Sequence, residues 1–133
     1  MKYALDTNVI IDILHNNAAV TQKFYRVVKR GIELVIPPFT HYEIRRGFLY
    51  NPAPTKEKAY KSLMFRYPVG NMDNEILERA AVLYAKLRRS GRTVDDVDIL
   101  IAAYCLCNGY TLVTHNTRHF SGIDKLVIED WQS

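Results

Sequence analysis

The sequence predicts an α/β protein built around a parallel β-sheet. Four short runs of continuously apolar or β-branched residues are typical of strands that are buried on both faces. Longer segments whose apolar residues recur at helical spacing lie between these runs. Strands that alternate with helices indicate βαβ units with right-handed crossovers, so we expect helices on both faces of the sheet.

Boundary signals mark where these elements begin and end. The expected strands cover residues 3–5, 34–36, 111–114 and 126–128. The expected helices cover residues 20–28, 76–87 and 99–106, and the loop YNPAPT at residues 50–55 connects two helices. Gly31 is suited to end the first of these helices, while Asp73 and Gly91 are suited to cap the second.

The size and composition of the chain fit one globular domain. With 133 residues, 48% of them hydrophobic, we expect a single domain over residues 1–133. The net charge of +4 and the sequence pI of about 9.1 permit a polyanionic partner, although a solvated surface explains them equally well. Cys105 and Cys107 lie two apart in a helical pattern and point in different directions, so we expect both to stay reduced.

No segment has the character of a membrane span or of a secretion signal. A span needs about 20 consecutive apolar residues, and no stretch approaches that length. Asp6 interrupts the apolar run at the N-terminus, which therefore lacks the apolar region of a signal peptide. We expect a cytoplasmic protein that does not associate with membranes.

Three acids and one asparagine are placed to meet at one edge of the sheet. Asp6 ends the first strand, and Glu43 follows the second. Asp98 opens the helix that leads into the third strand, and Asn116 lies just past that strand. Because ligands of open parallel sheets gather beyond the carboxyl ends of the strands, we expect these four side chains to lie close together.

Each acid also has an ordinary alternative role in helix capping. Asp6 can cap a helix that starts near Thr7, which is worth about 1 kcal/mol. Residues 40–43 match a capping box, and Asp95 and Asp98 have the same spacing. Capping does not require three acids to converge on one edge, so their convergence favours a shared function.

Converging carboxylates repel one another unless something compensates their charge. Within about 4–6 Å of each other, at least one of them is expected to have a raised pKa. Mg²⁺ removes this conflict, because it prefers oxygen ligands, keeps several waters and needs one or two carboxylates. Such an ion can activate water and stabilise charge on a phosphate, and Glu43 or Asp98 can orient the attacking water. The residues therefore favour metal-assisted phosphodiester hydrolysis.

Five motifs are spread over almost the whole chain. They are LDTNVIIDIL at residues 5–14, HYEIRRG at 41–47, DILIAAY at 98–104, LVTHNTRHF at 112–120 and LVIEDW at 126–131. In this order they resemble PIN-domain proteins, and most closely the VapC-type ribonuclease toxins of bacterial toxin–antitoxin pairs. Each motif alone is weakly specific, whereas their combination is specific.

The resemblance implies a three-layer α/β/α sandwich around a central parallel sheet. It implies endonucleolytic cleavage of RNA that depends on Mg²⁺ or Mn²⁺, and transfer RNA is a common target of relatives. It also implies a homodimer that is held silent by a cognate antitoxin, whose C-terminal segment lies over the active site.

Carried over position by position, the resemblance assigns roles to individual residues. Asp6, Glu43 and Asp98 match the acidic triad of the family, and Asp6 and Asp98 match its usual direct metal ligands. Thr7 and Asn8 match the small polar pair that follows the first aspartate. We expect this pair to steady Asp6 or a bound water and to contact the substrate.

Asn116 departs from the commonest family pattern, in which this position is often aspartate. Its amide oxygen accepts a contact but adds no negative charge. We therefore count Asn116 among the catalytic residues but expect at most one firm metal site without substrate. The motif DILIAA fixes the register on Asp98, so Asp95 is expected to cap that helix.

Arginines near the acids are candidates to bind RNA phosphates. Arg92 precedes the helix that carries the third acid, and Arg118 follows Asn116, so we expect both to contact substrate. Pairing with local acids is the alternative for such residues, including Arg45 and Arg46. His115 and His119 have the i, i+4 spacing of some metal sites, but no third ligand accompanies them.

Two other functions fit the same residues less well. One is a non-catalytic nucleic-acid- or protein-binding module on the same scaffold, but intact Asp6, Glu43 and Asp98 argue against a degenerate site. The other is a Mg²⁺-dependent phosphohydrolase of small molecules, which usually needs a lysine or threonine constellation that this sequence does not show convincingly. Metal-dependent cleavage of RNA distinguishes the three functions.

Overall fold

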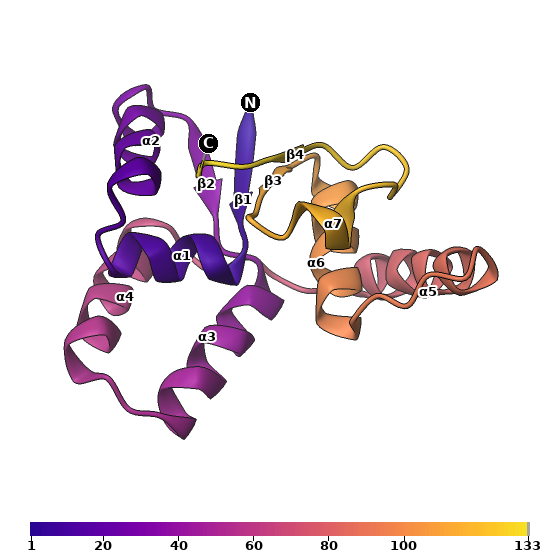
Figure 1. Cartoon of the computed structure of the whole chain (residues 1–133), viewed down its shortest axis with the longest axis horizontal. Coiled ribbons are helices and arrows are strands. Elements are labelled where there is room, and N and C mark those ends of the chain that lie inside the picture. Colours follow the sequence, from indigo (N-terminus) through magenta and orange to yellow (C-terminus); the bar gives the residue numbers. More distant parts are fainter. Residues whose placement is uncertain (133) are drawn as a thin grey trace.

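A parallel sheet forms the centre of the molecule in the computed structural model, which describes residues 1–132 (Figure 1). Four strands of this part of the chain lie in the order β2-β1-β3-β4, and every neighbouring pair is parallel. They are β1 (Lys2–Leu5), β2 (Glu33–Val35), β3 (Thr111–Val113) and β4 (Ile128–Glu129). The parallel sheet expected from the sequence is thus confirmed.

Helices cover both faces of this sheet. Helices α1 to α4 pack on one face, and α5 to α7 pack on the other (Figure 1). In order they are α1 (Thr7–Leu14), α2 (Ala18–Lys29), α3 (Pro38–Tyr50), α4 (Pro54–Arg66), α5 (Asn74–Arg89), α6 (Asp96–Asn108) and α7 (Thr117–Phe120). The three-layer α/β/α sandwich is therefore confirmed. Among the described residues, no helix has both the length and the apolar character that crossing a bilayer requires.

The side chains of β1 show why helices are needed on both faces. Tyr3 and Leu5 belong to the core against α1 to α4, whereas Ala4 belongs to the core against α5 and α6. Successive side chains of a strand point to opposite faces. All three are buried, which explains why the strand is a continuous apolar run in the sequence.

The helix boundaries mostly follow the capping signals. The Asp73 carboxylate accepts a hydrogen bond of 3.0 Å from the Ile76 N–H at the start of α5, as predicted. Gly31 and Gly91 follow α2 and α5 with φ angles of 69° and 80°, a left-handed conformation that glycine adopts without a steric penalty. The loop between α3 and α4 coincides with the predicted YNPAPT connection.

The fourth strand starts later than predicted, at Ile128 instead of residue 126. A turn occupies the preceding residues: the Leu126 N–H donates to the Ile123 carbonyl at 3.2 Å, and Lys125 has a φ of 66°. A left-handed lysine cannot continue an extended strand. Pairing with β3 therefore begins only after this turn.

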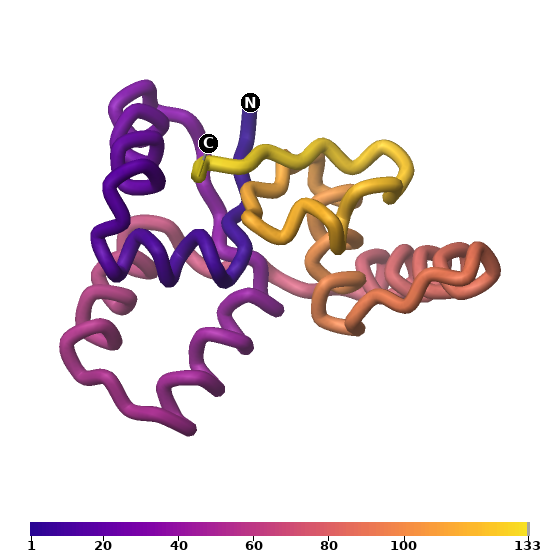
Figure 2. Tube along the Cα trace, in the orientation of Figure 1, coloured from indigo at the N-terminus to yellow at the C-terminus, as the bar shows by residue number. Residues whose placement is uncertain are grey.

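The C-terminal segment is anchored on the α1–α4 side of the sheet. Figure 2 shows the chain after β4 passing across β1 and ending near β2, on the side where α2 lies. Trp131 is fully buried there and packs edge-on against Tyr3, with ring centroids 5.7 Å apart. Asp130, the one residue between β4 and Trp131, is therefore held close to the carboxyl edge of the sheet.

Candidate active site

A pocket of about 400 Å³ opens at the carboxyl edge of the sheet. Four segments of the chain reach it: the turn after β1, helix α3, the start of α6 and the loop after β3. It is lined by Asp6, Thr7, Asn8, Ile11, Asp12, Glu43, Asp98 and Asn116. The structure thus brings together the three acids and the one asparagine predicted as catalytic, together with Thr7 and Asn8.

Asp6 is the most constrained member of the pocket, with 3% of its surface exposed. Its Oδ1 accepts a hydrogen bond of 2.8 Å from the Thr7 N–H, and its Oδ2 accepts one of 2.7 Å from the Thr114 hydroxyl. Burial raises the pKa of Asp6 to about 6; these two hydrogen bonds oppose the shift, and the charges of Asp98 and Glu43 add to it. Asp6 therefore caps α1 and faces two other acids at the same time.

Glu43 is held in place by partners on two helices. The Thr7 hydroxyl donates to Glu43 Oε1 at 2.6 Å, and the Arg46 guanidinium lies 3.5 Å from Oε2. The capping-box alternative is wrong, because α3 begins at Pro38 and the buried Thr40 hydroxyl has no hydrogen-bond partner within residues 1–132. The side chain of Glu43 is therefore available to the pocket.

Asp98 lies at the first turn of α6 and pairs with a histidine from α7. The His119 Nδ1 is 2.9 Å from the Asp98 Oδ2. Burial raises the pKa of Asp98, the contact with His119 opposes this shift, and the charge of Asp95 adds to it. Asp95 occupies the N-cap position of α6, as predicted, but its side chain makes no capping hydrogen bond.

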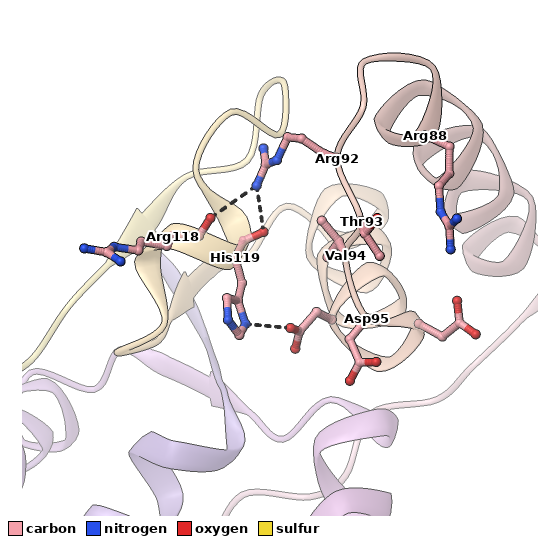
Figure 3. A pocket seen from close by; sticks show the side chains of 9 residues that line it. Arg88, Arg92, Thr93, Val94, Asp95, Arg118 and His119 are labelled. Carbon is pink, nitrogen blue, oxygen red and sulfur yellow. Dashed lines mark hydrogen bonds and ion pairs between the residues drawn. The ribbon is translucent and has the colours of Figure 1, made fainter.

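A second pocket of about 690 Å³ adjoins the first and shares Asp98 (Figure 3). Arg92 lies here, and its guanidinium donates to the backbone carbonyls of Arg118, His119 and Ser121. It therefore holds the end of α7 in place. Figure 3 shows the guanidinium of Arg118 pointing away from the carboxylates, so neither arginine reaches into the acidic pocket in this conformation.

Backbone contacts tie the loop after β3 to the pocket. The Asn116 N–H donates to the Thr114 hydroxyl oxygen at 3.0 Å, and that hydroxyl in turn donates to Asp6. The His115 N–H donates to the Asn8 Oδ1 at 3.2 Å. Asn8, the second residue of the small polar pair, thus contacts the neighbouring loop directly.

Sequence reasoning missed a seventh polar side chain of the pocket, that of Asp12. It lies four residues after Asn8 on α1, and this helical spacing places both on one face. The spacing was therefore a usable signal. Sequence reasoning also missed the partners of the two histidines, because His115 contacts Asp12 and Asp130 while His119 contacts Asp98.

The donor set of the pocket fits a hard divalent cation. No group of three or more His, Cys, Asp and Glu side chains within residues 1–132 is arranged as a ready-made metal site. Mg²⁺, however, needs only one or two carboxylates and completes its octahedron with water. Asp6 and Asp98 supply two carboxylates whose charges interact across the pocket. Burial is the main cause of the raised pKa of Asp6, and a cation there would relieve the repulsion that adds to it.

Comparison with known proteins shows what the chain resembles. A "tRNA(fMet)-specific endonuclease VapC" from Shigella flexneri and a "Ribonuclease VapC1" from Haemophilus influenzae are 29% and 27% identical to it, each over 132 residues and 98% of both chains. The solved structure of VapBC-1 from nontypeable Haemophilus influenzae superposes with a TM-score of 0.87 at 26% identity, over 100% of both chains. The sequence profile of the PIN domain matches residues 3–126, so the chain belongs to the PIN-domain family.

Proposed function

We propose that this protein is a metal-dependent endoribonuclease and the toxin of a toxin–antitoxin pair. The observation that carries the proposal is the convergence of Asp6, Glu43 and Asp98 from three separate elements on one pocket. Two full-length relatives are named as an endonuclease and a ribonuclease, which supports hydrolysis of RNA. The reaction is the cleavage of a phosphodiester bond by water.

Asp6 and Asp98 are the residues that we assign to Mg²⁺ or Mn²⁺. When bound, such an ion supplies an acidified water and stabilises charge on the phosphate. The hydrogen bonds from Thr7 and Thr114 occupy one lone pair on each oxygen of Asp6 and fix its plane. A carboxylate oxygen accepts more than one contact, so both oxygens keep a further acceptor position toward the pocket.

Glu43 is the residue that we assign to the attacking water. The Thr7 hydroxyl and the Arg46 guanidinium hold its two oxygens, so the carboxylate is oriented before substrate arrives. An oriented carboxylate can accept a proton from water as a general base. Asn8 and Asn116 supply uncharged amides that can contact substrate without adding repulsion.

The arginines have two different proposed roles in binding RNA. Arg118 lines the larger pocket with its guanidinium pointing away from the carboxylates, and we assign it to a phosphate of an extended strand. Arg92 acts indirectly, because its guanidinium is already engaged by the backbone at the end of α7 and positions the segment that carries Arg118. The net charge of +4 favours a polyanionic substrate.

The proposed partners follow from the relatives. The VapBC-5 structure from Mycobacterium tuberculosis is named as a member of the VapBC family of toxin–antitoxin systems, and the VapBC-1 structure carries the same family name. We propose that a cognate antitoxin binds this chain and covers its pocket. The first relative is named as specific for tRNA(fMet), which makes transfer RNA the first substrate to test. We further propose that the protein is a single domain that acts as a homodimer in the cytoplasm.

Cleavage of RNA by purified protein tests this function. Total cellular RNA is incubated with wild type, Asp6→Asn and Asp124→Asn, each with Mg²⁺, Mn²⁺ or EDTA, and cuts are mapped by end sequencing. Asp124 is exposed and does not line the pocket, so Asp124→Asn is the matched control for the loss of one acidic charge. We expect discrete cuts by wild type and Asp124→Asn with metal, and none by Asp6→Asn or in EDTA.

Two outcomes would contradict the proposal in different ways. Cleavage by Asp6→Asn at the wild-type rate would mean that the pocket is not the active site. The absence of cuts under every condition, with antitoxin shown to be absent, would favour the non-catalytic binding module on the same scaffold.

A further inference from the structure

The imidazole of His115 is held between two carboxylates. Its Nε2 lies 2.6 Å from the Asp12 Oδ2 on α1, and its Nδ1 lies 3.0 Å from the Asp130 Oδ1 in the C-terminal segment. The side chain of His115 has 11% of its surface exposed, so it is too enclosed to serve as a contact for RNA. The ring therefore joins two segments that are more than a hundred residues apart in the chain.

The same residue also sits in the chain of contacts that builds the pocket. Its backbone N–H donates to Asn8, one helical turn before Asp12 on α1. Its neighbours are Thr114, which donates to Asp6, and Asn116, which lines the pocket. Three consecutive residues of this loop are thus fastened to the acidic site or its walls.

We propose that His115 is a positioning residue of the active site, which clamps α1 to the C-terminal segment and thereby fixes Asn8 and Asn116 beside Asp6. The expected effect on kcat rests on the proposed nuclease function. The contacts of His115 and their effect on the positions of Asn8 and Asn116 do not depend on that function. The clamp also gives the C-terminal segment a part in the site, although its described residues, 130–132, line neither pocket described above.

Each ring nitrogen of His115 has a carboxylate oxygen as its partner, one on α1 and one in the C-terminal segment. Loss of the ring would therefore remove one contact from each of the two carboxylates. Asp12 lines a pocket that already holds the carboxylates of Asp6, Glu43 and Asp98, and its contact with His115 fixes its orientation there.

The surroundings of Asp130 support this arrangement. Burial acts to raise the pKa of Asp130, but hydrogen bonds from the Gln132 N–H and His115, with the nearby charges of His115 and Lys23, hold it below its usual range. The charged groups around the ring are thus Asp12 from α1, Asp130 from the C-terminal segment and Lys23 from α2. Trp131, the residue after Asp130, is buried in the core and keeps Asp130 within reach of His115.

The test compares His115→Gln with His15→Gln, a matched change at the exposed end of α1. The side-chain amide NMR signals of Asn8 and Asn116 are recorded without RNA, and kcat and KM for RNA cleavage are measured with Mn²⁺. We expect His115→Gln to shift both amide signals and to lower kcat by about tenfold with little change in KM. Residues that act by orienting other side chains of a site typically have effects of this size. His15→Gln should change neither.

A second variant keeps the test decisive if His115→Gln unfolds. Asp130→Asn preserves the size of the side chain and should give the same amide shifts and the same loss of kcat. The double variant should lose little more kcat than either single variant, because both changes break the contact between His115 and Asp130. Unmoved amide signals with wild-type kcat in a folded variant would overturn the clamp. If wild type cuts no RNA, the proposed function fails while the amide signals still decide this inference.

Discussion

Asp6 serves the fold and the candidate site with the same carboxylate. As a cap it accepts the Thr7 N–H, which stabilises the start of α1. As a site residue it is buried beside Asp98 and Glu43, which disfavours its charge. Without a cation these roles conflict, because the capping hydrogen bond prefers the ionised form and the surroundings prefer the neutral one.

Asp6→Asn should therefore stabilise the metal-free protein at neutral pH. The folded-state pKa of about 6 lies above the usual value near 3.9, so the contribution of Asp6 to stability is present below about pH 4 and is lost as pH rises through about 6. About two pKa units correspond to about 3 kcal/mol. In EDTA, urea unfolding should show that the free energy of unfolding of Asp6→Asn rises relative to that of wild type by up to this amount between pH 4 and pH 7.

Asp124→Asn is the control for this measurement, since that acid is exposed. Its difference from wild type should stay flat over the same pH range. A large loss of stability in Asp6→Asn at pH 7 in EDTA would mean that the capping role outweighs the cost of the buried charge.

The hydroxyl of Thr7 should matter more for catalysis than for folding. It is the donor that fixes Glu43 Oε1, and Thr7→Val removes it while keeping the shape of the side chain. We expect kcat to fall about tenfold while unfolding free energy drops by about 1 kcal/mol. Thr7→Ser restores the donor and should recover most of the rate. Equal kcat in Thr7→Val and wild type would mean that catalysis does not depend on the orientation of Glu43 by Thr7.

At the scale of the elements, the link between α4 and α5 is fixed by a close approach to α6. The Gly70 N–H donates to the Ile36 carbonyl at 2.8 Å, so the link runs beside the end of β2. A methyl group on Gly70 would overlap the Tyr104 hydroxyl and lie 2.7 Å from its ring Cζ. Tyr104 is buried in α6 and cannot swing away.

Gly70→Ala should thus destabilise the protein by overpacking, by about 1–3 kcal/mol in urea unfolding. Gly47→Ala is the matched control, because a methyl group there meets nothing within 4 Å inside α3. That change should be neutral or stabilising by up to about 1 kcal/mol, since alanine favours helix. In a Tyr104→Leu background the cost of Gly70→Ala should shrink, and an unchanged cost would place the strain elsewhere.

The elements themselves could be predicted where local chemistry decides them. Asp73 and Gly91 bound α5 through interactions within a few residues, and the sequence shows both. The start of β4 could not be predicted, because the left-handed Lys125 turn leaves no glycine or proline signal. The capping-box alternative for residues 40–43 is wrong for a related reason. Pro38 can stop a strand or begin a helix, and the capping box is excluded only because α3 begins there.

At the scale of the whole molecule, the pocket could be predicted because topology decides it. The carboxyl ends of parallel strands meet at one edge, so Asp6 and Asn116 had to be neighbours once β1 and β3 were adjacent. The engagement of Arg92 by the end of α7 and the His115 clamp could not be predicted. Both depend on side-chain contacts between segments whose spacing in the sequence carries no signal.

Binding of a cation to the pocket should couple to the stability of the whole fold. A ligand that binds the folded chain and not the unfolded one adds about 1.4 kcal/mol for each tenfold rise in concentration above its dissociation constant. Urea unfolding at pH 7.5, with MgCl₂ varied at fixed ionic strength, should show this slope for wild type and Asp124→Asn. Asp6→Asn should show a much weaker one, because it lacks a ligand and the repulsion that the cation relieves. Parallel slopes for wild type and Asp6→Asn would place the stabilising ion elsewhere on the protein and would separate the carboxylate cluster from metal binding.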